Sequence, residues 1–255
     1  MTKPAILIGM GEMGGVFARG LLRLGRPVYP VLRSDDMAER AQQIPEPAMV
    51  LVAVAEKDLH SVLDRLPQQW RDKVALLQNE LLPRDWQSYG FADPTVISVW
   101  FEKKKGQDYK VLVPSPVYGP NAQLLIDALQ NLSIPTFLVP DDNALLFQLV
   151  RKNVYILTTN IAGLVTGGTV DDLWSNHQTL ARDVASDVID IQEGLTQQHF
   201  DRERLIQGMV EAFHGDPQHK CMGRSAPARL ANAIAHADEA KLDVPTLREI
   251  SSSHT

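Results

Sequence analysis

The sequence is poor in the features that mark secreted, membrane-spanning or nucleic-acid-binding proteins. It contains a single cysteine, Cys221, which excludes an intramolecular disulfide and favours a reducing compartment. No apolar run approaches the length of a membrane span, and the N-terminal residues lack the order of a signal peptide. The net charge of −6 argues against a nucleic-acid partner. The one basic block is the lysine triplet 103–105, which predicts a solvated hairpin. We therefore expect a cytoplasmic protein with no membrane and no nucleic-acid partner.

The remaining composition is that of a globular protein, and 255 residues leave room for two domains. Up to about residue 140, short apolar runs alternate with helical segments, which predicts an α/β domain with a doubly wound, mostly parallel sheet. From there on the pattern is helical almost throughout. The predicted domains are therefore 1–140, of Rossmann type, and 141–255, all-helical. The tail 251–255 is expected to be disordered.

The predicted strands are short apolar runs, at residues 6–8, 28–32, 49–54, 74–78, 96–100, 111–114 and 136–139. Pro30 lies inside the second run, and a missing N–H donor is tolerated only at a sheet edge or a bulge. Residues 96–101 and 109–113 flank a polar stretch and predict an antiparallel hairpin added to the sheet.

A glycine motif follows the first strand and opens a helix, which is typical of dinucleotide-binding domains. The predicted cofactor-binding residues here are Gly9, Met10, Gly11, Glu12, Met13 and Gly14. Gly9 allows the tight turn, Gly11 lets a diphosphate approach the backbone, and Gly14 lets the helix pack on its strand. The helix start offers free N–H groups to the phosphates. The alternative is a glycine turn that binds nothing.

The residues after the second strand predict which cofactor is bound. An acidic residue there selects NAD through the ribose 2′-hydroxyl, but this chain has Arg33 and Ser34. A guanidinium can form a bidentate pair with a 2′-phosphate, so we predict NADP(H). Asp35 and Asp36 follow at once, and a register shift of two residues would favour NAD instead. The alternative is that Arg33 is a surface arginine with no role in cofactor binding.

A second candidate site lies on the helix that begins after residue 141. Lys152, Ile156 and Asn160 are spaced i, i+4 and i+8, so they form one stripe about 12 Å long. This places an ammonium and a carboxamide on one flank of an apolar helix. The alternative is a lysine that extends to solvent beside an ordinary helix asparagine.

The chain resembles the ketopantoate reductase family, the 2-dehydropantoate 2-reductases, over most of its length. The matching segments are 8–14, 25–33, 76–79, 117–120, 151–164 and 237–245. The resemblance implies a Rossmann domain followed by a helical domain like the C-terminal domain of 6-phosphogluconate dehydrogenase. It also implies hydride transfer from NADPH to a small 2-keto acid. Exposed helices of the second domain could support a homodimer.

The resemblance further implies residue roles. Lys152 matches the helix lysine that acts as general acid, since an ammonium can stabilise and protonate the carbonyl oxygen that gains charge. Asn160 would orient the carboxylate or hydroxyl of the substrate. Asn79 would lie beside the ribose or nicotinamide, at the carboxyl end of a strand.

Three positions depart from the family pattern. Ile156 stands where the family has its first helix asparagine, Ser225 where it has a late glutamate, and Val170 where it has a further asparagine. These losses of polar contacts argue against ketopantoate itself, because such groups discriminate strongly between substrates. A more apolar carbonyl or an imine is the hypothesis they favour, with Ile156, Asn160 and Ser225 as the substrate-binding candidates.

Two other functions remain open. One is an imine reductase of the pyrroline-carboxylate type, which would not need Lys152. The other is a catalytically weak NADP-binding sensor. His214, His219 and Cys221 lie close together in the sequence, but their spacing matches no zinc pattern, so we predict no metal site.

Overall fold

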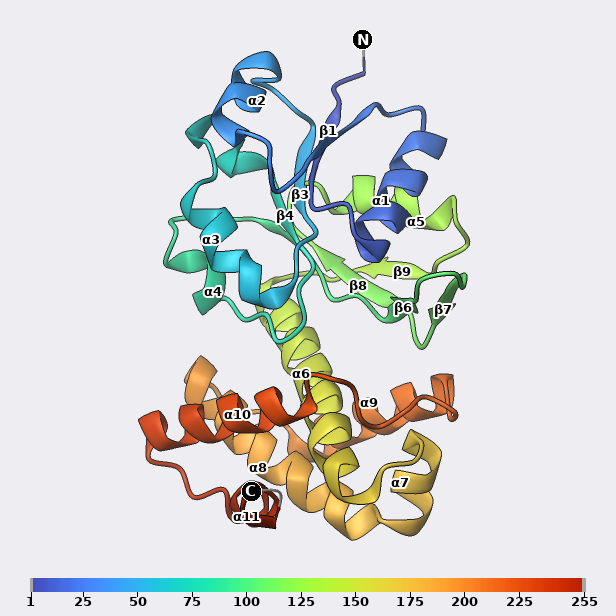
Figure 1. Cartoon of the computed structure of the whole chain (residues 1–255), viewed down its shortest axis with the longest axis vertical. Helices are drawn as coiled ribbons and strands as arrows, with labels where there is room; N and C mark the ends of the chain where they lie inside the picture. The colour runs from blue at the N-terminus through green and yellow to red at the C-terminus, as the bar shows by residue number, and fades with distance from the viewer. Residues whose placement is uncertain (1, 254–255) are drawn as a thin grey trace. The chain divides into compact units, whose positions relative to one another are not determined.

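The computed structural model describes residues 2–253, and the chain divides into two compact units, Met1–Gln148 and Leu149–Thr255 (Figure 1). The division falls after Gln148, inside the long helix α6 (Asp142–Thr166). The sequence places its boundary at residue 140, just before this helix.

The first unit is built on a seven-stranded sheet with strand order β2-β1-β3-β4-β5-β8-β9. The strands are β1 (Ala5–Ile8), β2 (Val28–Val31), β3 (Met49–Val52), β4 (Val74–Leu76), β5 (Thr95–Ile97), β8 (Ser115–Tyr118) and β9 (Thr136–Leu138). All neighbours pair in parallel except β5 and β8, which are antiparallel. With the helical second unit, this confirms the predicted fold class.

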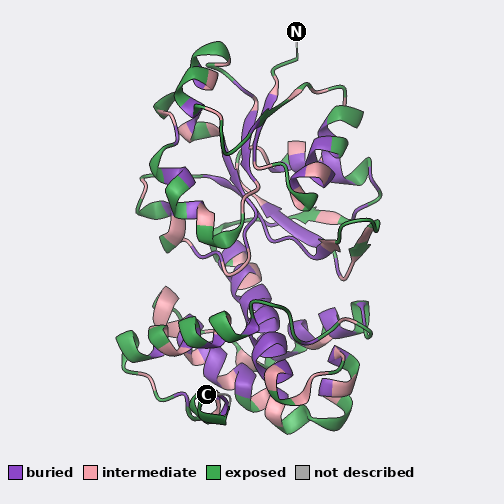
Figure 2. Ribbon diagram, in the orientation of Figure 1, coloured by how far each residue is buried: buried purple, intermediate pink, exposed green. Residues whose placement is uncertain are grey.

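Helices cover both faces of this sheet, so β1, β3 and β4 are apolar along their whole length and buried (Figure 2). In Figure 1, α1 and α5 lie on one side of the sheet and α2, α3 and α4 on the other. Their bounds are α1 (Glu12–Arg23), α5 (Ala122–Gln130), α2 (Met37–Gln43), α3 (Leu59–Asp64) and α4 (Arg84–Gln87), with 3₁₀ turns at Glu56–Asp58 and Gln68–Lys73.

Pro30 lies on an edge strand, as its missing donor requires. β2 is at the end of the sheet, and Pro30 is opposite Leu7 of β1 in the register. The carbonyls of Pro27 and Val31 accept hydrogen bonds from β1 and from the residue that follows it. The intervening Pro30 therefore turns its nitrogen toward the open edge.

The predicted hairpin is wrong in its extent. Residues 96 and 97 belong to β5, and the hairpin is a separate two-stranded sheet of β6 (Phe101–Lys103) and β7 (Tyr109–Val111). The strand predicted at 111–114 is replaced by β8, which carries Pro116 in its middle. Proline disfavours a strand in the interior of a sheet, so the pattern gave no signal for β8.

The second unit consists of helices that pack around the greater part of α6. They are α7 (Val170–Asn176), α8 (Gln178–Thr196), α9 (Arg202–Gly215), α10 (Ala226–Ala240) and α11 (Pro245–Ser253). Within residues 2–253, no helix combines the length and apolar character that crossing a membrane requires. Ser251–Ser253 form the last turn of α11 rather than a disordered tail, and residues 254 and 255 lie outside the described part.

Helix α1 packs closely on α5 through Gly20, which gives a testable stability difference. A Cβ at Gly20 would overlap the carbonyl oxygen of Ala128, whereas a Cβ at Gly15 meets nothing within 4 Å. We expect Gly20→Ala to lower the free energy of unfolding by about 1–3 kcal/mol, because the helices must separate. Gly15→Ala, the matched control, should raise it by about 0.5–1 kcal/mol. Urea unfolding measures both, and equal midpoints would contradict this packing.

Candidate cofactor-binding and catalytic site

The three glycines of the motif have different surroundings. Gly9 has φ +94°, and a Cβ there would lie 2.8 Å from the carbonyl oxygen of Ala53. A Cβ at Gly14 would overlap the carbonyl oxygen of Gly9. At Gly11 a Cβ would meet nothing within 4 Å. Two glycines are thus required by the fold, and the third leaves space for a ligand against the backbone.

Gly11 is also the N-cap of α1, and as a glycine it has no side chain that could cap the helix. The first N–H groups of a helix need a partner from outside the helix. Together with the helix dipole, they form a favourable place for an anion. The position and chemistry of the loop fit a dinucleotide diphosphate.

A groove of about 610 Å³ runs from the glycine loop across the carboxyl ends of β1, β2 and β3, a volume typical of ligand sites. Its polar lining outside the loop comes from Arg33, Asp35, Asp58, Ser61 and Arg65. A smaller cavity of about 260 Å³ shares Met10 and Gly11 with the groove. Its other lining residues are Glu12, Gly15, Val16, Arg19 and Lys103.

Arg33 lines the groove just beyond β2. Its side chain is 86% exposed, and its Nη2 donates to Asp58 Oδ2 at 3.0 Å. Ser34 is exposed and is not one of the residues described as lining this groove. Arg33 therefore stands at the groove with its cation accessible.

The two aspartates that follow Arg33 both bind backbone N–H groups. Asp35 Oδ2 accepts from Leu32 N at 2.9 Å, which closes the turn after β2. Asp36 caps α2 by accepting from Ala38 N at 2.8 Å. These bonds give each carboxylate a local structural role.

Sequence reasoning missed Asp58 and Arg65, which line the same groove from the segment after β3 and from the end of α3. The sequence did contain a signal for these two residues. Asp58 and Arg65 both follow the third predicted strand, and the carboxyl ends of parallel strands meet at one edge of the sheet, where ligands bind.

Asn79 follows β4 by three residues and is half-buried. Its neighbour Gln78 is buried and donates Nε2 to the carbonyls of Val52 and Val54, at 2.8 and 3.3 Å. Gln78 thereby ties the end of β4 to the segment after β3. Within the described part, Asn79 is not one of the residues that line the groove. Met13, a predicted cofactor-binding residue of the glycine loop, does not line it either and packs half-buried against the core.

In the second unit, α6 carries Lys152, Ile156 and Asn160 on successive turns, all less than 10% exposed. Its orientation is fixed by the residues beside Lys152. Arg151 donates to the carbonyl of Gly208 and to Glu211 of α9, and burial lowers the pKa of this guanidinium. Asn153 donates to Gln192 of α8 at 2.9 Å. These buried bonds resist rotation of α6 about its axis.

Asn160 is engaged on both sides of its amide. Its Nδ2 donates to the carbonyl of Ile156 at 2.9 Å, and its Oδ1 accepts from Arg229 Nη1 of α10 at 3.2 Å. Sequence reasoning did not anticipate Arg229, because the two residues are 69 positions apart. Ser225 is exposed at the start of α10, and Val170 is buried at the start of α7.

Gly163 lies inside α6, which continues to Thr166. A Cβ at Gly163 would lie 2.8 Å from Cys221 Cβ, so this glycine allows a close approach of the segment before α10. Gly167, with φ +62°, follows the true end of the helix.

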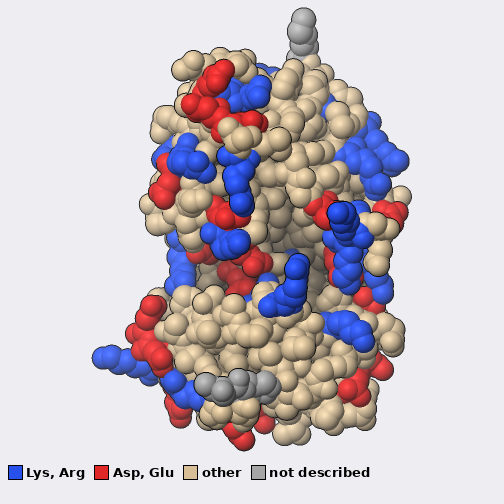
Figure 3. Space-filling view, in the orientation of Figure 1, with Lys and Arg blue, Asp and Glu red and all other residues tan. Residues whose placement is uncertain are grey.

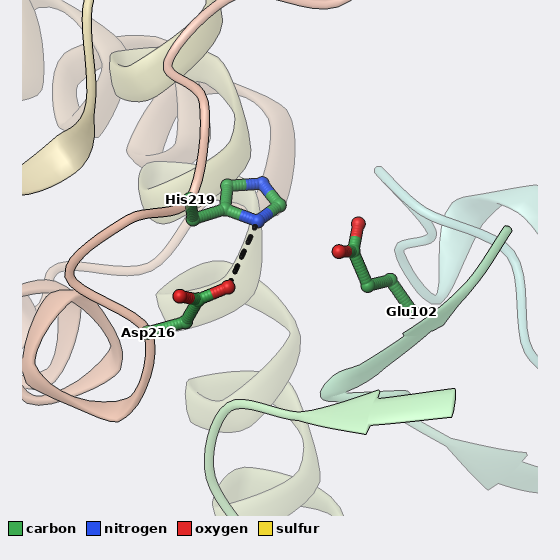
Figure 4. A group of neighbouring side chains, drawn as sticks. All are labelled: Glu102, Asp216 and His219. Carbon is green, nitrogen blue, oxygen red and sulfur yellow. Dashed lines mark ion pairs between the residues drawn. The ribbon is translucent and has the colours of Figure 1, made fainter. Parts of the chain in front are cut away.

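His219 forms an ion pair with Asp216, with Nδ1 and Oδ2 3.7 Å apart (Figure 4). His214 is exposed, and burial raises the pKa of the Cys221 thiol to about 11, so the thiol stays protonated at neutral pH. Within residues 2–253, no group of three potential metal ligands includes His214 or Cys221.

On the face seen in Figure 3, cationic and anionic side chains are interspersed.

No family model matches the sequence, and no curated protein is similar to it in sequence. Solved structures are similar in fold. One is 2-dehydropantoate 2-reductase from Methylococcus capsulatus, with a TM-score of 0.73 and 13% identity, covering 98% of this chain and 95% of that one. Another is a dimeric ketopantoate reductase from Staphylococcus aureus, with a TM-score of 0.66 and 17% identity over 98% and 96%.

D-mandelate dehydrogenase, in a ternary structure with NADH and anilino(oxo)acetate, is also similar. Its TM-score is 0.66 at 14% identity, covering 97% of this chain and 96% of that one. At identities this low, the TM-scores establish a shared fold over nearly the whole chain, and nothing beyond the fold. The resemblance drawn from the motifs is thus confirmed at the level of the fold.

Proposed function

We propose that this chain, which has the fold of the ketopantoate reductase structures, is an NADPH-dependent reductase of small 2-keto acids. The observation that carries the proposal is the groove that begins at the open backbone of Gly11 and ends at Arg33. A diphosphate fits the first position, and a 2′-phosphate fits the second. D-mandelate dehydrogenase, one of the structures similar in fold, was solved with NADH, so the proposed preference for NADPH rests on Arg33.

The proposed reaction needs a hydride, which the reduced nicotinamide supplies when bound. Lys152 acts as the general acid. Its ammonium donates a proton to the carbonyl oxygen of the substrate and stabilises the negative charge that develops there. Asn79 contacts the cofactor near the ribose or nicotinamide.

Asn160 and Ser225 are proposed to bind the polar groups of the substrate, and the Asn160 bond to Arg229 adds a cation suited to a carboxylate. Ile156 offers an apolar surface between Lys152 and Asn160. We therefore expect an apolar substituent on the 2-keto acid, rather than the hydroxyl of ketopantoate. Cysteine usage favours the cytoplasm, and the dimeric ketopantoate reductase favours a homodimer.

The proposal is tested most directly at Gly11. Its φ is −74°, so a side chain is tolerated there, and aspartate is a good N-cap. We expect Gly11→Asp to keep or slightly raise stability, because its carboxylate would cap α1 in the place of the diphosphate. Binding of NADPH and of NADH should each weaken by at least about tenfold, through steric exclusion and charge repulsion.

Gly11→Ser is the uncharged control, with a smaller loss expected because a hydroxyl caps the helix without repelling phosphate. Isothermal titration of wild type and both variants measures binding, and urea unfolding checks the fold. If wild type binds neither cofactor at micromolar concentrations, the proposed function is wrong. If Gly11→Asp binds like wild type, the diphosphate does not lie at this loop.

A further inference from the structure

The lysine triplet of the hairpin does not behave as one solvated group. Lys104 has a side chain 58% exposed and pairs with Glu102 in the hairpin itself. Lys103 has a side chain only 19% exposed, and its Nζ lies 2.9 Å from Glu12 Oε2. Glu12 is the first residue of α1. One lysine of the three is thus directed at the glycine loop.

The hairpin holds Lys103 in that place because its base packs against α1. The ring of Phe101 lies 6.1 Å from that of Phe17. The guanidinium of Arg19 lies 5.2 Å from the centre of the Tyr109 ring. Lys103 accordingly lines the smaller cavity together with Gly11 and Glu12, next to the opening of the groove.

Glu12 is an unfavourable neighbour for a diphosphate. In the proposed function, the diphosphate of the cofactor binds at the N-terminus of α1, and a carboxylate in the first turn repels it. A lysine ammonium has three donors. One bonds Glu12 and a second bonds the carbonyl oxygen of Lys104 at 2.9 Å, so the third can donate to a phosphate oxygen while both bonds are kept. Lys103 is placed to make the acidic first turn compatible with an anionic ligand.

We propose that Lys103 is a cofactor-binding residue that contacts the diphosphate and neutralises Glu12. This inference rests on the proposed function. It assigns the hairpin β6–β7 a role in cofactor affinity that is independent of the 2′-phosphate. The diphosphate is common to both nicotinamide cofactors, so Lys103 contributes equally to binding of NADPH and NADH.

The test compares Lys103→Gln with Lys104→Gln, the adjacent lysine of the same hairpin. We expect Lys103→Gln to raise the dissociation constants of NADPH and of NADH by a similar factor, about tenfold, through loss of a charge-assisted bond. Lys104→Gln should leave both constants unchanged. Lys103→Arg should retain most of the affinity, since it keeps the charge.

Glu12→Gln distinguishes neutralisation from simple support of the hairpin. In the Lys103→Gln background it removes the repulsion, so the double variant should bind both cofactors more tightly than Lys103→Gln alone. A structural role would instead leave affinity unrestored and lower the unfolding midpoint.

The inference is overturned if Lys103→Gln binds both cofactors as wild type does, or if it weakens NADPH alone. It is also overturned if the double variant binds no better than the single one. In all these cases wild type still binds cofactor, and the proposed function stands. Only a wild type that binds neither cofactor would overturn both.

Discussion

Replacing Lys152 with alanine should lower kcat for reduction of the best 2-keto acid by about 10²- to 10⁴-fold, the usual contribution of a general acid. The carbonyl oxygen gains negative charge as the hydride arrives, and without the ammonium nothing on this flank of α6 can protonate it. Ile156 is apolar, and the amide of Asn160 already bonds Ile156 and Arg229. Stopped-flow oxidation of NADPH across a panel of 2-keto acids and cyclic imines measures this effect.

Two controls separate chemistry from structure in this experiment. Cofactor affinity should not change, because the glycine loop and the groove are built entirely from the first unit. Added methylamine should restore part of the rate, since a small ammonium can occupy the truncated site. Turnover of a cyclic imine that survives in Lys152→Ala would favour the imine reductase. Cofactor binding without turnover of any compound by wild type would favour the sensor.

Arg33→Gln should raise the dissociation constant of NADPH by about tenfold or more and leave that of NADH nearly unchanged. The two cofactors differ only in the 2′-phosphate, and a guanidinium pairs with phosphate through two charge-assisted bonds. Isothermal titration with both cofactors gives the ratio directly. Arg40→Gln is the matched control, since Arg40 lies on α2, bonds Gln43 and is not among the residues that line the groove in the described part.

Asp58 gives this experiment a second arm. Its carboxylate is bonded to Arg33, so the 2′-phosphate must compete with it. We expect Asp58→Asn to tighten NADPH binding several-fold and to leave NADH binding unchanged. If Arg33→Gln leaves the ratio of the two affinities as it is in wild type, Arg33 is a surface arginine and the preference for NADP(H) is wrong.

Local rules made much of the first unit predictable. The glycine spacing predicted the loop because backbone conformation and close packing admit only glycine at Gly9 and Gly14. Hydrophobic periodicity predicted most of the parallel sheet and the long helix α6. It failed at β8, where Pro116 contradicts strand propensity but is accommodated by neighbours that lie far away in the sequence.

Side-chain partners across the fold could not be predicted in the same way. The sequence did not show that Asp35 closes the turn after β2 and that Asp36 caps α2. Lys103 looked like part of a solvated triplet, and its bond to Glu12 spans 91 positions. No periodicity or propensity encodes such a pairing.

The sequence by itself determined the loop that can cradle a diphosphate, the arginine after the second strand and the stripe of Lys152, Ile156 and Asn160. These depend on φ angles, strand ends and helical spacing, which are properties of short segments. Only the tertiary structure decided which charges meet: Arg33 with Asp58, Lys103 with Glu12, and Asn160 with Arg229. The physical reason is that electrostatic and hydrogen-bond contacts act over a few ångströms of space, whatever the separation along the chain.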